Sequence, residues 1–185
     1  FGDNVTIGDN VRITSHSGIL VGNETIIKDG TIITGEKRVI IGNASYIGRT
    51  CLFDCTEDIV IGDRVFMSFT KIYTHANNYS TFVKGKPFER KGVDIGSNTF
   101  IGPDTFIAPG LRISRNSYIG PRTLLHTDTK PHIFYSGNPG RAVKDVNKEI
   151  EEMQNNIDIH ESLLNYLVET YSIKETRVIN NKSFS

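Results

Sequence analysis

An apolar residue recurs at every sixth position along most of this chain, and no other feature restricts the possible folds as strongly. The register runs from Phe1 to Leu125 and continues through three two-residue slips and one long insertion, giving eighteen hexads in six groups of three. All eighteen begin with an apolar residue, although only 37% of the chain is apolar. The leading residues are Phe1, Ile7, Ile13, Val21, Ile27, Ile33, Ile41, Ile47, Phe53, Ile61, Met67, Tyr73, Ile95, Ile101, Ile107, Ile113, Ile119 and Leu125. A period this short predicts a solenoid of stacked, similar units.

Two other positions of the hexad carry a consistent signal. The second is glycine in nine hexads, namely Gly2, Gly8, Gly22, Gly42, Gly48, Gly62, Gly96, Gly102 and Gly120. The fifth is mostly small or β-branched, as in Val5, Thr25, Ser45, Cys51, Thr99, Ser117 and Thr123. We interpret each hexad as one strand and one turn, in which glycine permits a backbone conformation that a Cβ would resist. The fifth residue is then small because it packs at an inner corner.

Three hexads are predicted to close one triangular coil, and coils to stack at the strand spacing of ~4.8 Å. Each coil then covers the apolar face of the next. The slips Ile19–Leu20, Val39–Ile40 and Ile59–Val60 each follow a third hexad, so coils start at residues 1, 21, 41 and 61. The extra pair is expected to stack on one corner. Residues 79–94 separate the fourth coil from the fifth and predict a loop that projects from the prism.

A different period begins after an exit loop at residues 131–140, which contains prolines and glycines. Apolar residues then alternate in steps of four and three over residues 145–172, which is typical of one face of an α-helix. This helix is expected either to lie along the prism or to pair with the same helix of other subunits. Residues 173–185 are polar and are expected to form a loose tail.

Composition argues against several classes of protein. The 21 Lys and Arg residues balance 21 Asp and Glu residues, so nothing indicates binding to nucleic acid or to an anionic membrane. The sequence has no run of about 18 apolar residues, so no membrane-spanning helix is expected. Cys51 and Cys55 do not indicate a disulfide framework, and a reduced, cytoplasmic setting is expected. Because Phe1 already leads a hexad, we expect further residues before it in the natural chain.

Three segments give residues 1–144 a family resemblance. They are Ile72-Tyr73-Thr74-His75 before the long loop, IGSNTFIG at 95–102 and SGNPGRAVK at 136–144. On these segments the chain resembles the hexapeptide-repeat acyltransferases, and most closely the sugar O-acetyltransferases of the galactoside, maltose and serine acetyltransferase type. The resemblance implies a left-handed parallel β-helix of about six coils, although crossovers are usually right-handed. It also implies an acetyl-CoA donor, no metal, and a homotrimer with active sites between subunits.

His75 is the candidate catalytic residue. It is the third residue of the last hexad before the insertion, so its side chain is expected to point outward beside the loop. An imidazole suits the role of a general base near neutral pH. The resemblance implies that His75 takes the proton of the acceptor while the acceptor oxygen attacks the thioester of acetyl-CoA directly. The alternative is an ordinary surface histidine.

Four residues are candidates for binding the acceptor. The resemblance places a carboxylate that holds an acceptor hydroxyl in the region of Asp54, and a carboxylate accepts sugar hydroxyls well. The alternative for Asp54 is an ordinary turn aspartate. Asn77, Asn78 and Tyr79 begin the insertion, whose aromatic residues are expected to stack on a sugar or to contact a neighbouring subunit. Long ordered loops on a repeat fold are usually functional.

The coenzyme groove is inferred from the resemblance alone. The expected contacts are Phe100, Gly102, Pro103, Gly120, Pro121, His126, Thr127, Arg141 and Lys144. Arg141 and Lys144 suit the phosphates of the coenzyme. Pro103 and Pro121 stand where the family commonly has a small residue with a free N–H, and proline cannot donate that hydrogen bond.

The function predicted from the sequence is transfer of an acetyl group from acetyl-CoA to a saccharide hydroxyl, in a surface-polysaccharide or sugar-modifying pathway. One alternative is N-acetylation of a nucleotide-linked amino sugar, and another is a non-catalytic hexapeptide scaffold. A zinc-dependent hydratase would need three clustered histidines, and the five here are scattered. A covalent route through Cys55 is also considered, because regular stacking places this residue under His75.

Overall fold

The computed structural model is a parallel β-helix, as the hexads predict, and it describes residues 1–76 and 89–149. The chain divides into two compact units, 1–145 and 146–185. Of the second unit only residues 146–149 are described, and a helix begins there at Asn147. The predicted tail and most of the predicted helix at 145–172 therefore lie outside the described residues. Within the described ranges, no helix is long and apolar enough to cross a membrane.

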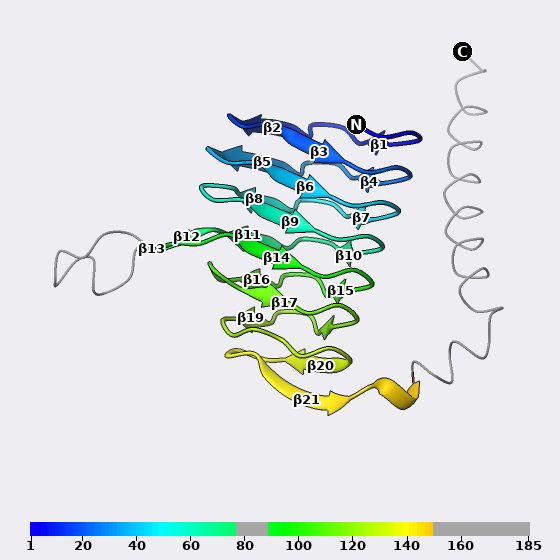
Figure 1. Ribbon diagram of the computed structural model, residues 1–185, viewed down its shortest axis with the longest axis vertical. Coiled ribbons are helices and arrows are strands. Elements are labelled where there is room, and N and C mark those ends of the chain that lie inside the picture. Colours follow the sequence, from blue (N-terminus) through cyan, green and yellow to red (C-terminus); the bar gives the residue numbers. More distant parts are fainter. Residues whose placement is uncertain (77–88, 150–185) are drawn as a thin grey trace, which may run out of the picture. The chain divides into compact units, whose positions relative to one another are not determined.

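Three sheets form the sides of the β-helix, and successive coils add one strand to each in turn (Figure 1). Sheet A contains, in order, β1 (Thr6–Ile7), β4 (Ile26–Ile27), β7 (Tyr46–Ile47), β10 (Phe66–Met67), β15 (Phe100–Ile101), β18 (Tyr118–Ile119), β20 (Ile133–Ser136) and β21 (Arg141–Asp145). Sheet B contains β2 (Arg12–Ser15), β5 (Ile32–Gly35), β8 (Leu52–Asp54), β11 (Lys71–Tyr73), β16 (Phe106–Ile107) and β19 (Leu124–Leu125). Sheet C contains β3 (Ile19–Val21), β6 (Val39–Ile41), β9 (Ile59–Ile61), β14 (Val93–Ile95) and β17 (Arg112–Ile113).

The turns that join these sheets run along three edges of the prism, which we call the AB, BC and CA edges. In the fourth coil the BC edge carries a separate antiparallel pair, β12 (His75–Ala76) and β13 (Glu89–Arg90). Figure 1 shows these two strands leaving the stack beside β11. The coil resumes at Val93, which pairs with Ile59. At the far end of sheet A, β21 runs antiparallel to β20 and closes the stack with a non-repeating strand.

The leading residues of the hexads form the core. From the second coil onward most are almost completely buried, and the largest of them is Phe53. The first coil has no coil above it among residues 1–145, and Phe1 and Ile7 are correspondingly exposed. From the second coil onward the small fifth residues are buried at the inner corners as predicted, and the hydroxyls of Thr25, Thr31 and Ser45 bond to the next coil. Thr25 Oγ1, for example, donates to the carbonyl of Gly42 at 2.7 Å.

The glycines of the second position are required for a different reason from the predicted one. A Cβ on Gly42 would lie 2.6 Å from the carbonyl carbon of Gly62 and 2.7 Å from the amide nitrogen of Asp63, both in the next coil. Its φ angle is not in the left-handed region, so close approach of two backbones excludes a side chain here. Residues with a φ angle in the left-handed region lie mainly at the fourth position of the hexad. Many of them are not glycine, for example Ala44 and Arg64.

The two-residue slips also differ from the prediction. The pairs Ile19–Leu20, Val39–Ile40 and Ile59–Val60 do not stack on a corner but begin the strands of sheet C, in register with one another. All six residues are apolar and all but Leu20 are β-branched, which suits an extended strand. The slips therefore lengthen one side of the prism in the first three coils.

The fourth coil departs from the hexad register by one residue. Tyr73 was predicted to face the core, but Ile72 takes that position and pairs with Phe53, while Tyr73 pairs with Asp54 on the outer face. The cause is a short AB turn. Three residues, 68–70, separate Met67 from β11, whereas four residues, 48–51, make the equivalent turn of the third coil. Each residue from Lys71 to His75 consequently lies one position further along the third coil than the hexad register predicts.

The glycine interpretation predicts a difference between two single substitutions. Gly42→Ala should lower the free energy of unfolding by about 3 kcal/mol, because the next coil must move away from the new methyl group. Gly18→Ala is the matched control, since Gly18 has a φ of +82° but open space around its Cβ position. It should cost only about 1 kcal/mol. Urea denaturation followed by circular dichroism measures both, and equal losses would contradict the close-approach explanation.

Candidate functional site

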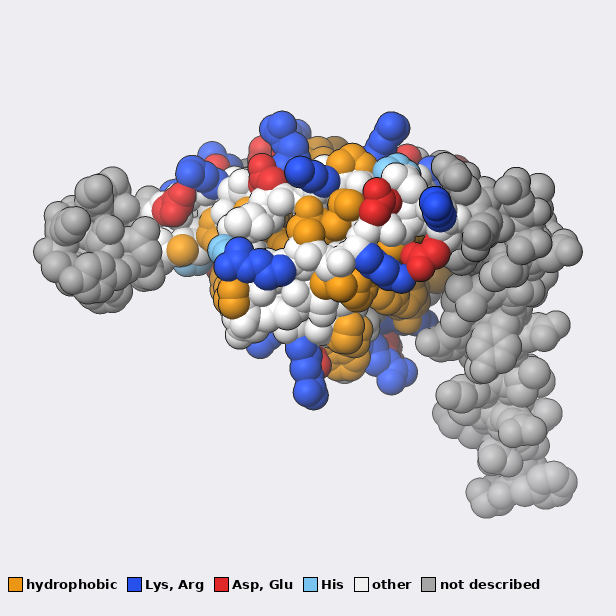
Figure 2. Space-filling view, turned by 90° about the horizontal axis from the view of Figure 1, so that it is seen from below, with side chains coloured by type: hydrophobic (Ala, Val, Ile, Leu, Met, Phe, Trp, Pro, Cys, Tyr) orange, Lys and Arg blue, Asp and Glu red, His pale blue; other side chains and the backbone are white. Residues whose placement is uncertain are grey.

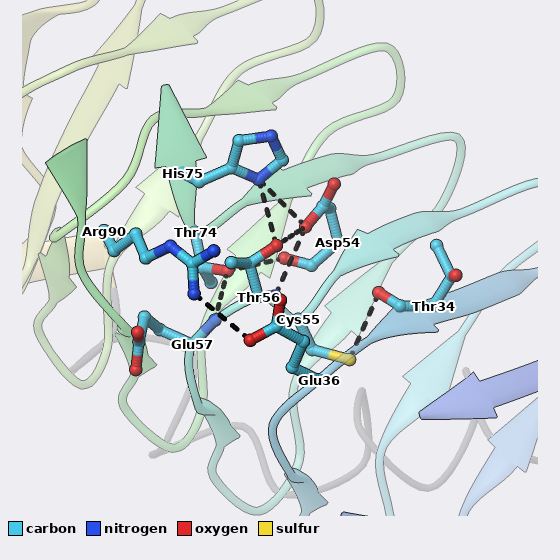
Figure 3. Close-up of polar contacts among 9 residues, drawn as sticks. All are labelled: Thr34, Glu36, Asp54, Cys55, Thr56, Glu57, Thr74, His75 and Arg90. Atoms are coloured by element: carbon cyan, nitrogen blue, oxygen red, sulfur yellow. Dashed lines mark hydrogen bonds and ion pairs between the residues drawn. The ribbon is translucent and has the colours of Figure 1, made fainter. Parts of the chain in front are cut away.

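The BC edge brings Asp54, Thr56 and His75 together at the third and fourth coils (Figure 3). Asp54 ends β8, Thr56 lies in the turn that follows, and His75 begins β12. Tyr73 pairs with Asp54 across two neighbouring coils. Thr56 and His75 each follow two residues later and therefore lie next to each other. Residues 21 positions apart in the sequence thus become neighbours through strand pairing alone.

Three hydrogen bonds join the side chains of this cluster. His75 Nδ1 lies 3.2 Å from Asp54 Oδ1 and 3.1 Å from Thr56 Oγ1, and the Thr56 hydroxyl donates to Asp54 Oδ1 at 2.8 Å. An ionised carboxylate can only accept hydrogen bonds, so the proton of the neutral ring belongs on Nδ1. This assignment leaves Nε2 with its lone pair, and Figure 3 shows Nε2 on the side of the ring away from Asp54 and Thr56.

A buried threonine holds the turn beneath the cluster. Thr74 is completely buried, and its hydroxyl donates to the backbone carbonyl of Asp54 at 2.8 Å while accepting from the backbone N–H of Glu57 at 2.8 Å. Asp54 Oδ1 also accepts from the backbone N–H of Thr56 at 3.3 Å, in the manner of an Asx turn. The turn at 54–57 is therefore fixed from below, independently of the Thr56 hydroxyl.

The strands that begin and end the insertion are tied to the same edge. His75 pairs with Arg90, and Arg90 Nη1 donates to Glu36 Oε2 at 3.1 Å, on the BC edge of the second coil. Lys91 N–H donates to the carbonyl of Thr74 at 2.9 Å. The Arg90–Glu36 ion pair is about half exposed on both sides and adds little stability, at most about 1 kcal/mol. Its effect is to orient the base of the insertion toward the earlier coils.

The coil that follows His75 has fewer residues on the BC edge. Five residues, 54–58, separate the core residues Phe53 and Ile59 in the third coil, whereas three residues, 108–110, separate the equivalent Ile107 and Leu111 in the fifth. These three residues are Ala108, Pro109 and Gly110, and the side chain of Lys91 packs against Gly110, with its Cδ 2.8 Å from the position of an added Cβ. His75 is 37% exposed and Asp54 20%, which leaves the imidazole accessible to a ligand.

Cys55 does not lie under His75, contrary to the prediction from regular stacking. The one-residue shift of the fourth coil places Thr56 beside the imidazole instead. The Cys55 thiol is fully buried and donates to the carbonyl of Thr34 at 3.2 Å, and burial raises its pKa. Burial also raises the pKa of Cys51, to about 11. Both groups are protonated thiols at neutral pH, which argues against a thiolate nucleophile.

The residues expected to bind a coenzyme fall on two different edges of the chain. His126 and Thr127 are exposed on the BC edge, two coils beyond His75 and so about 10 Å along the stack. Gly102, Pro103, Gly120 and Pro121 lie instead on the AB edge. Packing alone accounts for Gly102, because a Cβ there would lie 2.6 Å from the nitrogen of Pro121.

The remaining predicted contacts lie on sheet A or outside the described residues. Phe100 is half exposed on the outer face, where its ring stacks on Phe66 at 5.5 Å. Arg141 and Lys144 are exposed on β21 at the C-terminal end of the stack. Figure 2 shows this end, with basic side chains projecting around its rim and hydrophobic side chains between them. Asn77, Asn78 and Tyr79 are outside the described residues.

Thr56 and Thr74 were not predicted from the sequence. The sequence nevertheless contains a signal for Thr56. The small residue Thr70 is the fourth residue of its hexad and not the fifth, and this shift of one residue brings His75 beside Thr56. Among residues 1–76 and 89–149, no three His, Cys, Asp or Glu side chains are grouped as a metal site.

Neither a family model nor a curated protein sequence matches the chain. Solved structures do. AntD from Bacillus cereus, an N-acyltransferase solved with dTDP and 3-hydroxybutyryl-CoA, superposes with a TM-score of 0.71 and 22% identity, covering 88% of this chain and 90% of its own.

Two other acyltransferases share the architecture. A maltose O-acetyltransferase from Clostridium difficile 630 gives a TM-score of 0.55 and 24% identity, covering 78% of this chain and 68% of its own. A hexapeptide-repeat acetyltransferase from Vibrio cholerae gives 0.54 and 16%, covering 80% and 73%. The chain thus has the fold of the hexapeptide-repeat acyltransferases, as its sequence motifs predict.

The burial of the cysteines predicts slow alkylation. In the native protein at pH 8, iodoacetamide should modify Cys51 and Cys55 at least about 100-fold more slowly than in urea, because both thiols are buried and a raised pKa leaves little thiolate. Mass spectrometry of tryptic peptides measures each site separately. Rapid native labelling of Cys55 would show that its thiol is accessible and would restore the covalent route.

Proposed function

We propose that this protein transfers an acyl group, most simply acetyl, from coenzyme A to a sugar acceptor, with His75 as the general base. The observation that supports this most directly is the hydrogen bond between His75 Nδ1 and Asp54, which orients the ring and leaves Nε2 to act as a base. The fold shared with acyltransferases makes the thioester the natural electrophile.

The proposed reaction is a direct transfer. The acceptor hydroxyl gives its proton to His75 Nε2 as its oxygen attacks the thioester carbonyl carbon. The tetrahedral intermediate collapses with loss of the coenzyme A thiolate, which takes the proton back from the imidazolium. Asp54 stabilises the imidazolium formed between these steps and keeps the correct tautomer. No residue of this chain becomes acylated, which agrees with the burial of Cys55.

A sugar hydroxyl is the proposed acceptor. A hydroxyl is a weak acid and needs a base during the attack itself, which is the condition that a carboxylate-supported imidazole meets. In this proposal the acceptor approaches from the side of the insertion, where residues 77–79 are the proposed contacts. The thioester is proposed to approach from the side of Ala108–Gly110, a turn of small residues next to the side chain of Lys91.

An amine of a nucleotide-linked sugar is the second candidate, and one observation favours it. The match to AntD covers nearly all of both chains, whereas the match to the maltose O-acetyltransferase covers 68% of that protein. AntD is an N-acyltransferase whose structure contains dTDP. A neutral amine would attack the thioester in the same geometry, with His75 removing the extra proton.

We further propose a homotrimer that acts in the cytoplasm. The expected coenzyme residues Gly102 and Pro103 lie on an edge that His75 does not share, so one chain does not bring them together. The family resemblance implies active sites between the chains of a trimer, and in a ring of three chains the AB edge of one chain can face the BC edge of the next. A reduced compartment suits two free cysteines and coenzyme A itself.

Removal of the base should abolish the proposed reaction. With acetyl-CoA and a panel of mono-saccharides, oligosaccharides and amino-sugar nucleotides, His75→Ala should lower kcat by at least about 100-fold, and Asp54→Asn by about 10²- to 10⁴-fold. His16→Ala is the control, because His16 is an exposed histidine on the same edge in the first coil. Mass spectrometry of the product distinguishes an ester from an amide. Full activity in His75→Ala would refute the assignment of the base.

Sharing of the site between chains should be visible by complementation. Light scattering should give a mass near three times the 20.7 kDa of the chain. Co-expression of His75→Ala with Pro103→Arg, each inactive alone, should restore part of the activity, because a mixed trimer contains some interfaces with neither substitution. A monomer, or mixed assemblies with no activity, would contradict a shared site.

A further inference from the structure

The hydroxyl of Thr56 occupies a position that the proposed mechanism does not use. It lies 2.8 Å from Asp54 Oδ1 and 3.1 Å from His75 Nδ1, so one oxygen contacts both members of the proposed pair. Asp54 Oδ1 therefore has three donors around it: the Thr56 hydroxyl, the Thr56 backbone N–H and His75 Nδ1.

The chemistry of the three groups fixes the direction of each bond. The carboxylate only accepts, so the Thr56 O–H points to Asp54, and the His75 Nδ1–H is shared between Asp54 Oδ1 and the lone pairs of Thr56 Oγ1. The carboxyl torsion of an aspartate is broad and roughly two-fold. A second side-chain donor on Oδ1 holds the carboxylate in the one orientation that presents this oxygen to the imidazole.

We infer that Thr56 is a positioning residue that holds the Asp54 carboxylate and the His75 ring in the geometry needed for catalysis. The inference rests on the proposed function, because it concerns the base of that reaction. Thr56 does not touch the acceptor or the thioester. It acts through Asp54 and His75, in a cluster of three side chains rather than two.

The fold itself does not depend on this hydroxyl. Thr56 is only partly buried and is absent from the core cluster, and the turn that contains it is held by Thr74 and by backbone bonds. Replacement by valine keeps the β-branched shape and the backbone N–H while removing the hydroxyl alone. Serine keeps the hydroxyl and removes only a methyl group.

The experiment compares Thr56→Val, Thr56→Ser and His75→Ala in steady-state turnover with acetyl-CoA and the best acceptor of the panel. Thr56→Val should lower kcat about 10- to 100-fold, the range expected for one hydrogen bond to a charged group, with KM for acetyl-CoA unchanged. Thr56→Ser should remain within about threefold of the wild type. In proton NMR with ¹⁵N-labelled histidine, the Nδ1–H signal of His75 should exchange with water faster in Thr56→Val than in Thr56→Ser.

The outcomes separate this inference from the proposed function. Full activity in Thr56→Val together with an inactive His75→Ala would overturn the role of Thr56 and leave the base assignment intact. Equal losses in Thr56→Val and Thr56→Ser, with matching losses in thermal stability, would show a structural role and would also overturn it. Activity retained in His75→Ala would overturn the proposed function itself.

Discussion

Hydrogen bonding between successive coils is the constraint on which the rest of this structure depends. The strands of sheets A, B and C find their partners in neighbouring coils, and the N–H of Gly42, for example, donates to the carbonyl of Ile61 at 2.8 Å. The backbones approach so closely at the corners that a methyl group on Gly42 has no room. Side chains at the CA edge continue the pairing, since Asn43 Oδ1 accepts from the N–H of Asn23 at 2.8 Å. A coil cannot satisfy these groups alone, and its stability comes from its neighbours.

The BC edge is the part of the prism where this constraint is weakest. The AB and CA edges repeat one four-residue turn with a left-handed residue, shortened only at 68–70, whereas the BC connection is constant in the first three coils, carries the insertion in the fourth and shortens in the fifth. An edge without a fixed turn accommodates additional residues without disturbing the sheets on either side. The base of the insertion, the Asp54–Thr56–His75 cluster and the Arg90–Glu36 pair all lie there. Loops on a rigid scaffold commonly carry function for the same reason.

The fold was predictable from the sequence because a period of six leaves few alternatives. The core positions follow the predicted register up to Met67, and then Tyr73 and Ile72 exchange roles. The prediction is wrong there because the turn at 68–70 is one residue shorter than a regular hexad requires. The candidate site was predicted in part. Asp54 and His75 were both identified, but strand register decides that they contact each other, and Thr56 was assigned no role. The coenzyme residues that the resemblance implies are divided between two edges, which becomes visible only once the strands are assigned to sheets.

The short turn at residues 68–70 has a consequence for how such proteins acquire new chemistry. In an ideal repeat, each outward residue has the same neighbours above and below at every level, so substitution changes a site one side chain at a time. Loss of a single residue from a turn acts differently. It moves a whole strand by one step along its neighbour, exchanges its inner and outer faces, and gives every side chain on it a new partner at once. Here that step exchanges a buried thiol for a threonine beside the histidine. Chain length within a turn, and not residue identity alone, is therefore a heritable variable that selects which groups meet.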